Sequence, residues 1–405
     1  MKQDPIKLEK KYLMQTYARS PIVLERGKGC WVWDTRGKKY LDLVSGLGVN
    51  SLGYSHPRIL KALREQAAKA IHVSNLYYHP YQGPLAAELA KVTGMDRAFF
   101  CNSGTEAVEG AIKLARVHAG SRGPIRSKDK FEVVALDNSF HGRTIGALSA
   151  TGQPKYRKEF EPLVPGFHFV RYNDVNDLQT RVNEKTCAVL VEPIQGEGGI
   201  FELSRKFMEA ASVLARRYQA VLICDEIQAG LGRTGYYLAS QAYGVKPDIV
   251  LLAKPLAGGL PLGAFLAREE VAASMTAGMH GSTFGGGPLA CRVALEFLAV
   301  LREEKILAHV RKVGKYFHHR LLDLKKKHPL IREVRGKGLM LALDLDRPSK
   351  PFVQAALERG LIVNSTHDTV LRFLPPLILT PQQVDLASAI LDALFADADR
   401  IAPLP

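Results

Sequence analysis

The sequence predicts an α/β protein with two parts, a large domain on a mostly parallel sheet and a smaller α+β domain. First, strand-like apolar runs alternate with helical patterns from about residue 54 to residue 300, as in a parallel sheet covered by helices on both faces. Second, this alternation stops near residue 304, where a long helical pattern begins. Third, 405 residues suffice for one large domain and a smaller one.

The predicted strands of the large sheet are short apolar runs bounded by turn residues. Examples are Arg97–Cys101, Glu132–Leu136, Cys187–Val191, Val221–Ile227 and Asp248–Ala253. Between two of them, the apolar residues of Arg205–Gln219 recur at close to helical spacing, which predicts an amphipathic helix.

A different pattern follows in the C-terminal part. The expected elements are a helix over Ile306–Lys327, one strand-like stretch over Val334–Leu345, a helix near Phe352–Glu358, a strand over Val370–Phe373 and a final helix from Gln382. A hairpin through Gly29–Asp42, turning at Thr35-Arg36-Gly37, is expected to join this small domain. We therefore predict an N-terminal segment of residues 1–53, a large domain of 54–304 and a small domain of 305–405.

Composition is ordinary for a soluble globular protein, with 46% hydrophobic and 23% charged residues. No apolar stretch approaches the roughly 20 residues of a membrane span, and the polar N-terminus lacks a signal-peptide core. The five cysteines are scattered and odd in number, which argues against a disulfide framework. We therefore predict a cytoplasmic protein without a membrane partner.

The net charge of +15 is high. It raises the question of nucleic acid, acidic lipids or anionic substrates as partners. The densest basic run, Lys325-Lys326-Lys327, ends a predicted helix and is most simply a solvated face. Because no nucleic-acid motif is present, we predict no nucleic-acid partner. Carboxylate substrates account for only a few of the arginines.

Two predicted strands end in residues that suit one cofactor. Asp225 closes the run Val221-Leu222-Ile223-Cys224-Asp225, and Lys254 closes the next apolar run. Open α/β sheets bind ligands at the carboxyl ends of their strands. A lysine amine and a carboxylate side by side suit an aldehyde cofactor with a basic ring nitrogen, which is the protein's part in pyridoxal-phosphate chemistry. Each residue alone also fits a solvated turn.

Further motifs fit the same cofactor. Asn102-Ser103-Gly104-Thr105-Glu106 follows a strand and opens a helix, which suits a phosphate. It also fits a capping box of Ser103 and Glu106, and the two interpretations are compatible. Phe140-His141-Gly142-Arg143 offers a ring to stack on a flat cofactor and a guanidinium to clamp a carboxylate, or equally a core phenylalanine beside a surface arginine.

Three more segments stay open when each is taken alone. Glu192-Pro193-Ile194-Gln195-Gly196-Glu197 fits a tight loop with two acids as well as a site loop. Gly281-Ser282-Thr283-Phe284-Gly285 fits an anion-binding loop or a plain surface loop. Arg372 interrupts an apolar strand and needs an anionic partner, either a protein carboxylate or a substrate.

Taken in order, these motifs resemble one family. They are Ser-Gly-Thr-Glu-Ala, Phe-His-Gly-Arg, Glu-Pro-Ile-Gln-Gly-Glu-Gly-Gly, Asp-Glu-Ile-Gln, Ala-Lys-Pro-Leu-Ala-Gly-Gly, Gly-Ser-Thr-Phe-Gly-Gly and Leu-Arg-Phe-Leu-Pro-Pro. The set, which covers nearly the whole chain, resembles the class III (subgroup II) aminotransferases, and most of all their acetylornithine branch. The resemblance implies the type I pyridoxal-phosphate-dependent transferase fold and a homodimer with sites shared between subunits.

The resemblance also implies roles for individual residues. For pyridoxal 5'-phosphate they are Lys254 at the aldehyde, Asp225 at the ring nitrogen, Gln228 near the ring hydroxyl, Phe140 and Ile227 on the two ring faces, Ser103, Gly104 and Thr105 at the phosphate, and Thr283 from the partner subunit. For the substrates they are Tyr17 and Arg143 at the donor's α-carboxylate, Ser282 nearby, Arg372 at the α-carboxylate of glutamate or 2-oxoglutarate, and Glu197 masking Arg372 otherwise. No metal is expected.

Some positions depart from the family pattern. Gly287 stands where the family usually has Asn, and Tyr54 stands where His is common. Leu47 stands where enzymes that use free ornithine tend to carry Tyr. A leucine offers no polar partner to a charged α-amino group and leaves room for an acylated one.

The expected reaction therefore moves the terminal amino group of N2-acetyl-L-ornithine to 2-oxoglutarate, as in arginine biosynthesis. Succinyldiaminopimelate, succinylornithine, ornithine and 4-aminobutyrate are alternative donors. An aminomutase on the same fold is a rival of another class, but Arg143 and Arg372 together suit alternating amino-acid and dicarboxylate substrates. A binding protein without catalysis is the third possibility, against which the intact Lys254–Asp225 pair argues.

Overall fold

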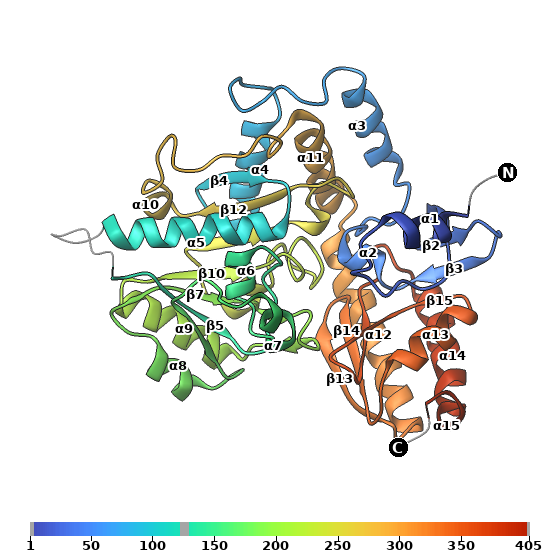
Figure 1. Ribbon diagram of the computed structural model, residues 1–405. Helices are drawn as coiled ribbons and strands as arrows, with labels where there is room; N and C mark the ends of the chain where they lie inside the picture. Colours follow the sequence, from blue (N-terminus) through green and yellow to red (C-terminus); the bar gives the residue numbers. More distant parts are fainter. Residues whose placement is uncertain (1–3, 122–128, 403–405) are drawn as a thin grey trace.

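The computed structural model describes residues 4–121 and 129–402. A large region surrounds a seven-stranded sheet, and a smaller region holds the C-terminus (Figure 1). The strands are β1 (Leu24–Lys28), β2 (Trp31–Asp34), β3 (Lys39–Asp42), β4 (Arg97–Cys101), β5 (Glu132–Leu136), β6 (Phe167–Val170), β7 (Thr186–Val191), β8 (Ile194–Gln195), β9 (Phe201–Glu202), β10 (Val221–Asp225), β11 (Ile249–Leu252), β12 (Gly263–Ala267), β13 (Ile331–Lys337), β14 (Met340–Leu345), β15 (Leu361–Ile362), β16 (Asn364–Thr366) and β17 (Val370–Phe373). The α-helices are α1 (Pro5–Tyr12), α2 (Ser45–Gly48), α3 (Pro57–Ala67), α4 (Gln82–Thr93), α5 (Gly104–Ser121), α6 (Ile145–Ser149), α7 (Pro154–Arg157), α8 (Val175–Arg181), α9 (Arg205–Arg217), α10 (Glu269–Ala272), α11 (Pro288–Glu303), α12 (Ile306–Lys327), α13 (Lys350–Glu358), α14 (Pro381–Ala396) and α15 (Ala398–Ile401). Short 3-10 helices are η1 (Lys158–Phe160), η2 (Ala239–Tyr243) and η3 (Lys254–Leu256).

The large sheet has the strand order β4-β12-β11-β10-β7-β5-β6. Its centre is parallel, because β10 pairs in parallel with both β7 and β11, and β5 does so with β7 and β6. Strands β7, β10 and β11 are buried along their whole length, as expected for parallel strands covered on both faces. The predicted mostly parallel sheet is confirmed. The strands named from the sequence did not include β6 or β12, and β12 runs antiparallel to β11 and β4.

Helices cover both faces of this sheet because successive side chains of a strand point to opposite faces. Ile223 of β10 lies in one apolar cluster with residues of α5, whereas Leu222 and Cys224 lie in another with residues of α9. Helix α9 begins where the Ser204 hydroxyl accepts a hydrogen bond from the Phe207 N–H at 3.1 Å. This packing fixes the carboxyl ends of β10 and β11 side by side.

The smaller region is built on the antiparallel sheet β13-β14-β17-β16. The single strand expected over Val334–Leu345 is wrong, because this stretch contributes to two paired strands, β13 and β14, that turn at Gly338 and Leu339. Gly338 has a φ of +60°, and a Cβ there would lie 2.7 Å from the Arg233 carbonyl oxygen. The turn therefore requires a glycine, and Gly336-Lys337-Gly338 is the sequence signal for the turn that the prediction overlooked.

The predicted N-terminal hairpin is present as β2 and β3, with β1 added beside β2. Strand β15, from the C-terminal part of the chain, pairs in parallel with β3. The N-terminal strands therefore share a sheet with a segment more than three hundred residues away in the sequence.

Arg233 connects the two regions. It is buried, and its Nη1 donates hydrogen bonds to the carbonyl oxygens of Leu339 at 3.0 Å and Pro375 at 2.5 Å. Its Nη2 donates to the Ser51 hydroxyl at 3.3 Å. Within residues 4–121 and 129–402, no carboxylate forms an ion pair with Arg233 in the structure. Burial lowers the pKa of Arg233 to about 9.

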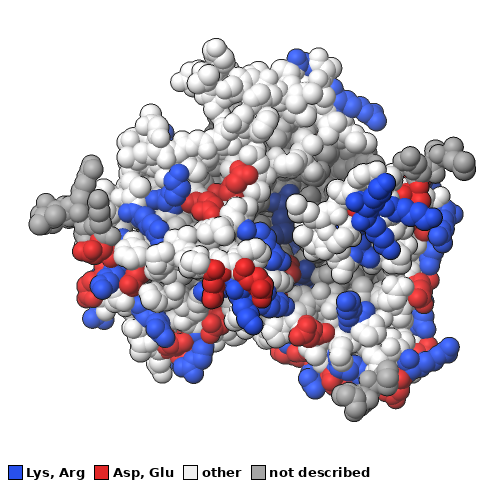
Figure 2. All heavy atoms as spheres, in the orientation of Figure 1, with Lys and Arg blue, Asp and Glu red and all other residues white. Residues whose placement is uncertain are grey.

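Charged side chains are spread over the face shown in Figure 2, where basic and acidic groups alternate rather than forming one large basic patch. This arrangement suits a solvated surface more than a nucleic-acid track. In the described part of the chain, no helix combines the length and the apolar character needed to cross a membrane.

Candidate active site

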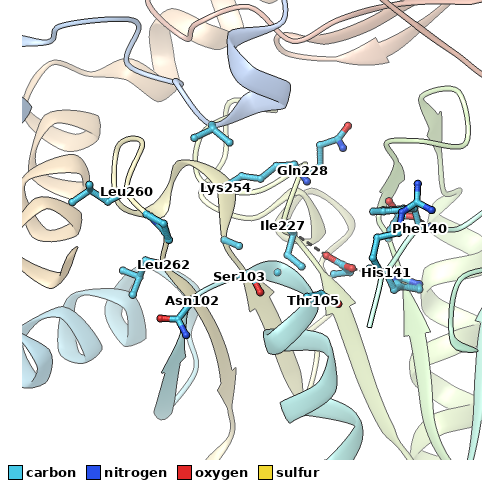
Figure 3. Close-up of a pocket in the computed structure, with 18 of the residues that line it drawn as sticks. Asn102, Ser103, Thr105, Phe140, His141, Ile227, Gln228, Lys254, Leu260 and Leu262 are labelled. Atoms are coloured by element: carbon cyan, nitrogen blue, oxygen red, sulfur yellow. Dashed lines mark hydrogen bonds and ion pairs between the residues drawn. The ribbon is translucent and has the colours of Figure 1, made fainter. Parts of the chain in front are cut away.

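A cavity of 450 Å³ lies at the carboxyl ends of β10 and β11 (Figure 3). The predicted site residues that line it are Ser103, Gly104, Thr105, Phe140, Arg143, Asp225, Ile227, Gln228 and Lys254. The cavity also contacts residues without a predicted role, among them Val49, Asn102, His141 and Glu192. The structure thus gathers in one place residues from segments spread over about 150 positions.

Asp225, at the end of β10, has a firmly held carboxylate and is only 5% exposed. Its Oδ1 accepts a hydrogen bond from the Ile227 N–H at 3.1 Å, and its Oδ2 accepts one from Nδ1 of His141 at 2.8 Å. Because a carboxylate only accepts, this bond places the His141 proton on Nδ1. The Asp225 carboxylate is therefore oriented before any ligand binds.

Lys254 directly follows the loop residue after β11 and opens η3. Its φ is +44°, a left-handed conformation that residues other than glycine rarely adopt. Burial lowers the pKa of the Lys254 amine, against the opposing charges of Asp225 and Glu197. The lowered pKa favours the neutral amine, which is the form that attacks a carbonyl carbon.

The first turn of α5 forms the floor of the cavity. The capping interaction predicted from the sequence is present, because the Ser103 hydroxyl accepts from the Glu106 N–H at 3.3 Å and donates to the Glu106 carboxylate at 3.2 Å. The Glu106 N–H is bonded to the Ser103 hydroxyl and the Ala107 N–H to the Ser103 carbonyl oxygen, so this turn offers the N–H groups of Gly104 and Thr105 to an anion. Gly104 allows close approach, since a Cβ there would lie 2.9 Å from Cδ1 of Ile227. A phosphate fits this end of the cavity.

Phe140, Arg143 and Glu192 form another wall. The Phe140 N–H donates to Glu192 Oε2 at 3.0 Å, and the Arg143 guanidinium lies 4.1 Å from the ring centre of Tyr156. Burial raises the pKa of Glu192 to about 7, helped by the charge of Asp225 and opposed by His141. Glu192 thus belongs to a buried polar group behind the Phe140 ring, together with His141 and Asp225.

Arg372 lies beside this cavity with its charge neutralised. Its side chain is 1% exposed, and its Nη1 donates to Glu197 Oε1 at 2.5 Å and to Gln228 Oε1 at 3.2 Å. Burial opposes ionisation of Glu197, but the charge and hydrogen bond of Arg372 outweigh burial and lower the Glu197 pKa. The anionic partner of Arg372 in this structure is therefore a protein carboxylate.

Three predicted residues lie elsewhere on this protomer. Tyr17 is 72% exposed and lines a separate groove of the N-terminal segment. Thr283 is exposed in the loop before α11 and does not line the cavity. Ser282 reaches the edge, where its hydroxyl accepts a hydrogen bond from Asn102 Nδ2 at 3.3 Å. A role for Tyr17 or Thr283 stays a prediction that requires a second subunit or a movement of the segment.

The residues that line the cavity fit pyridoxal phosphate. The half-buried Lys254 and the buried Asp225 follow neighbouring strands, and the start of α5 suits the phosphate. Phe140 and Ile227 offer apolar faces for a flat ring. His141, Glu192 and Asn364 are polar residues that the sequence pattern did not single out. His141 and Glu192 stood inside the recognised motifs, and that position was their only signal.

Comparison with known proteins gives a consistent result. The family model described as aminotransferase class-III matches residues 12–395. The acetylornithine aminotransferase of Aquifex aeolicus (strain VF5) is 50% identical over 381 residues, covering 94% of this chain and 98% of the relative. That of Methanocaldococcus jannaschii is 46% identical over 395 residues, covering 98% of both chains.

Solved structures agree. The ornithine aminotransferase of Toxoplasma gondii ME49 superposes with a TM-score of 0.93 at 36% identity, covering 98% of this chain and 95% of that one. The acetylornithine aminotransferase of Elizabethkingia anophelis gives 0.87 at 34% identity, covering 97% and 98%. The predicted type I fold is confirmed, and the chain belongs to the class-III aminotransferase family, whose members are transaminases that work with pyridoxal phosphate.

Proposed function

We propose that this transaminase moves the terminal amino group of N2-acetyl-L-ornithine to 2-oxoglutarate, giving N-acetyl-L-glutamate 5-semialdehyde and L-glutamate, a step of arginine biosynthesis. The observation that carries the proposal is the Glu197–Arg372 pair next to Lys254, because it suits a site that must take two unlike substrates in turn. The acetylornithine aminotransferases with 43–50% identity over nearly the full chain support the choice of donor.

Pyridoxal phosphate supplies an aldehyde that condenses with amines and a ring that withdraws the electrons left behind when a C–H proton is removed. Lys254 would hold it at the aldehyde, Asp225 at the ring nitrogen, and Ser103, Gly104 and Thr105 at the phosphate. Phe140 and Ile227 would hold the two ring faces, with Gln228 near the ring hydroxyl.

Lys254 has two parts in this proposal. Its amine would hold the aldehyde and would give way to the incoming substrate amine. The amine released in this way, with its lowered pKa, would then serve as the base that takes the proton from the substrate carbon. The Asp225 carboxylate, held by Ile227 and His141, would favour a protonated ring nitrogen through its charge.

Arg372 and Glu197 separate the two half-reactions. The terminal-amine substrate brings no carboxylate close to its reacting carbon, so Glu197 neutralises Arg372 during this half-reaction. Glutamate brings an α-carboxylate that displaces Glu197 and takes the bidentate contact with Arg372. Arg143, with Tyr17, receives the α-carboxylate of acetylornithine at the other end of the cavity. The positions of both arginines around the cavity favour a transferase over an aminomutase.

Leu47 favours an acylated donor. It lies in α2, where residues 45–48 all have left-handed φ values, and it is 41% exposed. Val49, two residues further along the chain, lines the cavity. An isobutyl side chain offers no hydrogen bond to a free α-amino group. Ornithine is therefore the disfavoured donor, although ornithine aminotransferases are among the similar solved structures. Succinylornithine differs from acetylornithine only in its acyl group and stays an alternative. Succinyldiaminopimelate, which also carries a carboxylate on its reacting carbon, stays one as well.

We further propose a cytoplasmic homodimer with shared sites. Five large hydrophobic residues near the loop before α11 and the segment before α4 are exposed on this protomer: Ile71, Leu76, Tyr77, Tyr78 and Phe284. A group of this size is typical of a surface that another protein covers. Thr283 precedes Phe284, is exposed and does not line the cavity of its own protomer, which fits a contact with the partner's phosphate site. All five cysteines are free thiols, which suits a reducing compartment.

The test is a panel of donors with 2-oxoglutarate as acceptor, ranked by kcat/KM. The panel contains N2-acetylornithine, succinylornithine, succinyldiaminopimelate, ornithine and 4-aminobutyrate. We expect acetylornithine to rank first and free ornithine to rank at least tenfold lower. A higher value for ornithine or 4-aminobutyrate would replace acetylornithine as the donor, and amino-group exchange without 2-oxoglutarate would indicate a mutase.

A further inference from the structure

Asn364 makes the most extensive contact with Arg372, and no motif includes it. Its Oδ1 accepts hydrogen bonds from Arg372 Nε at 3.1 Å and from Nη2 at 2.6 Å. The two residues lie directly opposite each other on the antiparallel strands β16 and β17. Because a guanidinium only donates, the atom of Asn364 that faces it must be the oxygen.

This contact leaves one edge of Arg372 available. A guanidinium offers paired N–H groups on a side edge, Nε with Nη2, and on an end edge, Nη1 with Nη2. Asn364 takes the side edge, while Glu197 Oε1 contacts Nη1 of the end edge at 2.5 Å. A carboxylate that replaces Glu197 therefore finds the end edge already oriented.

The neighbouring residue Thr366 holds the other half of the pair. Its hydroxyl donates to the Glu197 carbonyl oxygen at 2.8 Å, and it is buried. Arg372 belongs to the smaller region, whereas the Glu197 loop follows β8 of the large region. Strand β16 thus bonds to both the Arg372 guanidinium and the Glu197 backbone, but not to the Glu197 carboxylate, which bonds to Arg372 and Gln228.

The amide of Asn364 differs from a carboxylate in one decisive respect. It accepts two hydrogen bonds from Arg372 but carries no charge, so the charge of Arg372 stays available to a ligand. An aspartate of nearly equal shape would neutralise Arg372 permanently, because a residue opposite it in the same sheet cannot leave. A site for two substrates needs both features: a neutral acceptor, Asn364, that stays bonded to Arg372, and an acid, Glu197, that a substrate carboxylate can displace.

We propose that Asn364 is the positioning residue for substrate exchange at Arg372. It must be neutral, because the charge of Arg372 is balanced by Glu197 in one half-reaction and by the substrate carboxylate that displaces Glu197 in the other. The inference rests on the proposed function, in which Arg372 receives the α-carboxylate of glutamate or 2-oxoglutarate. It makes Asn364 a determinant of the acceptor, separate from the residues that select the amine donor.

The experiment measures the two half-reactions separately in single turnovers of the holoenzyme, and the binding of glutarate, a dicarboxylate without an amine, by calorimetry. In Asn364→Asp we expect kcat/KM for glutamate to fall about 10- to 100-fold, which is the loss expected for one charge-assisted hydrogen bond. The fall should come from a higher KM, and the affinity for glutarate should fall by a similar factor. The acetylornithine half-reaction should change less than threefold (roughly the scatter among single-site effects). In Asn364→Ala, a less constrained Arg372 should lower only glutamate kcat/KM, about tenfold.

The double variant Asn364→Asp with Glu197→Gln tests whether the glutamate half-reaction depends on the position of the acid beside Arg372 or only on the net charge around it. It has the same charge as the natural pair, but its acid cannot be displaced. We expect the glutamate half-reaction to stay slow, and its recovery to the natural rate would overturn the proposal. Ser365→Ala is the matched control, because the Ser365 hydroxyl bonds to Ser349 at 2.7 Å rather than to the pair. Equal slowing of both half-reactions in Asn364→Asp would also overturn it.

Failure of the proposed function is distinguishable from failure of this inference. If the natural protein performs neither half-reaction, the proposed function is wrong. If it performs both and the aspartate variant keeps its glutamate kinetics and glutarate affinity, only the role of Asn364 is wrong.

Discussion

Removing the Glu197 carboxylate should favour one half-reaction over the other. In Glu197→Ala we expect the ratio of kcat/KM for glutamate to that for acetylornithine to rise. Glutamate no longer has to displace an acid bonded to Arg372 at 2.5 Å. Acetylornithine, in contrast, must react beside the buried Arg372 guanidinium after the variant has removed the carboxylate that neutralised it.

The magnitude follows from the burial of the pair. The Arg372 side chain is 1% exposed and that of Glu197 is 23% exposed, so solvent screens this contact weakly. A hydrogen bond to a charged group contributes about 1.5–3 kcal/mol. Since about 1.4 kcal/mol corresponds to a factor of ten, the ratio should rise about 10- to 100-fold. Asn364 and the Gly196 carbonyl still accept from Arg372, so the fold should persist.

Stopped-flow measurement of each half-reaction tests this ratio. Arg372→Ala should shift it in the opposite direction, because glutamate then loses its partner and acetylornithine does not. Glu202→Ala is the matched control: Glu202 is an acid on the paired strand β9 and bonds to Lys337 at 2.8 Å, away from Arg372. If Glu197→Ala and Arg372→Ala slow both half-reactions by the same factor, the pair is structural and the reasoning is refuted.

Three further substitutions test the assigned roles. Lys254→Ala should abolish turnover while circular dichroism and dimer size stay unchanged, and multiple turnovers without added amine would contradict its role. Asp225→Asn should bind cofactor, seen as visible absorbance, yet react at least about tenfold more slowly, because an amide lacks the charge that stabilises a protonated ring nitrogen; near-natural rates would reject this. Thr283→Ala should weaken cofactor binding about tenfold or more, and mixing it with Lys254→Ala chains should restore about a quarter of the sites in a randomly mixed dimer. No recovery in verified heterodimers would assign Thr283 to its own subunit.

The sequence predicted most of the large sheet because its central strands are continuous apolar runs. Strand β4 and β5 were predicted with the bounds that the structure shows. The β13–β14 turn was missed although Gly336-Lys337-Gly338 interrupts the apolar pattern, because a glycine inside a strand-like run also fits a bulge. The pairing of β13 with β14 shows the reversal. Strand β12 was missed because the Gly- and Pro-rich segment before it is typical of a loop.

The cavity residues were predicted from sequence motifs. A motif shows which chemical groups are present, but it does not show which residues of neighbouring strands lie opposite each other. The sequence offered Arg372 as a buried cation, yet its contact with Asn364 depends on the pairing of β16 with β17. The bond between His141 and Asp225 joins residues 84 positions apart and follows from sheet order. Tyr17 and Thr283 lie outside the cavity of their own protomer, so a single chain does not test their roles.

Arg233 has a consequence for the way the molecule melts. Its guanidinium bonds to Ser51, Leu339 and Pro375, which belong to separate segments and meet only when both regions are folded. Opening either region would separate the cation from the two carbonyl oxygens and the hydroxyl that accept its hydrogen bonds at the same moment. Partly unfolded forms are thereby disfavoured, and we expect calorimetry to record one cooperative heat-absorption peak for both regions rather than two.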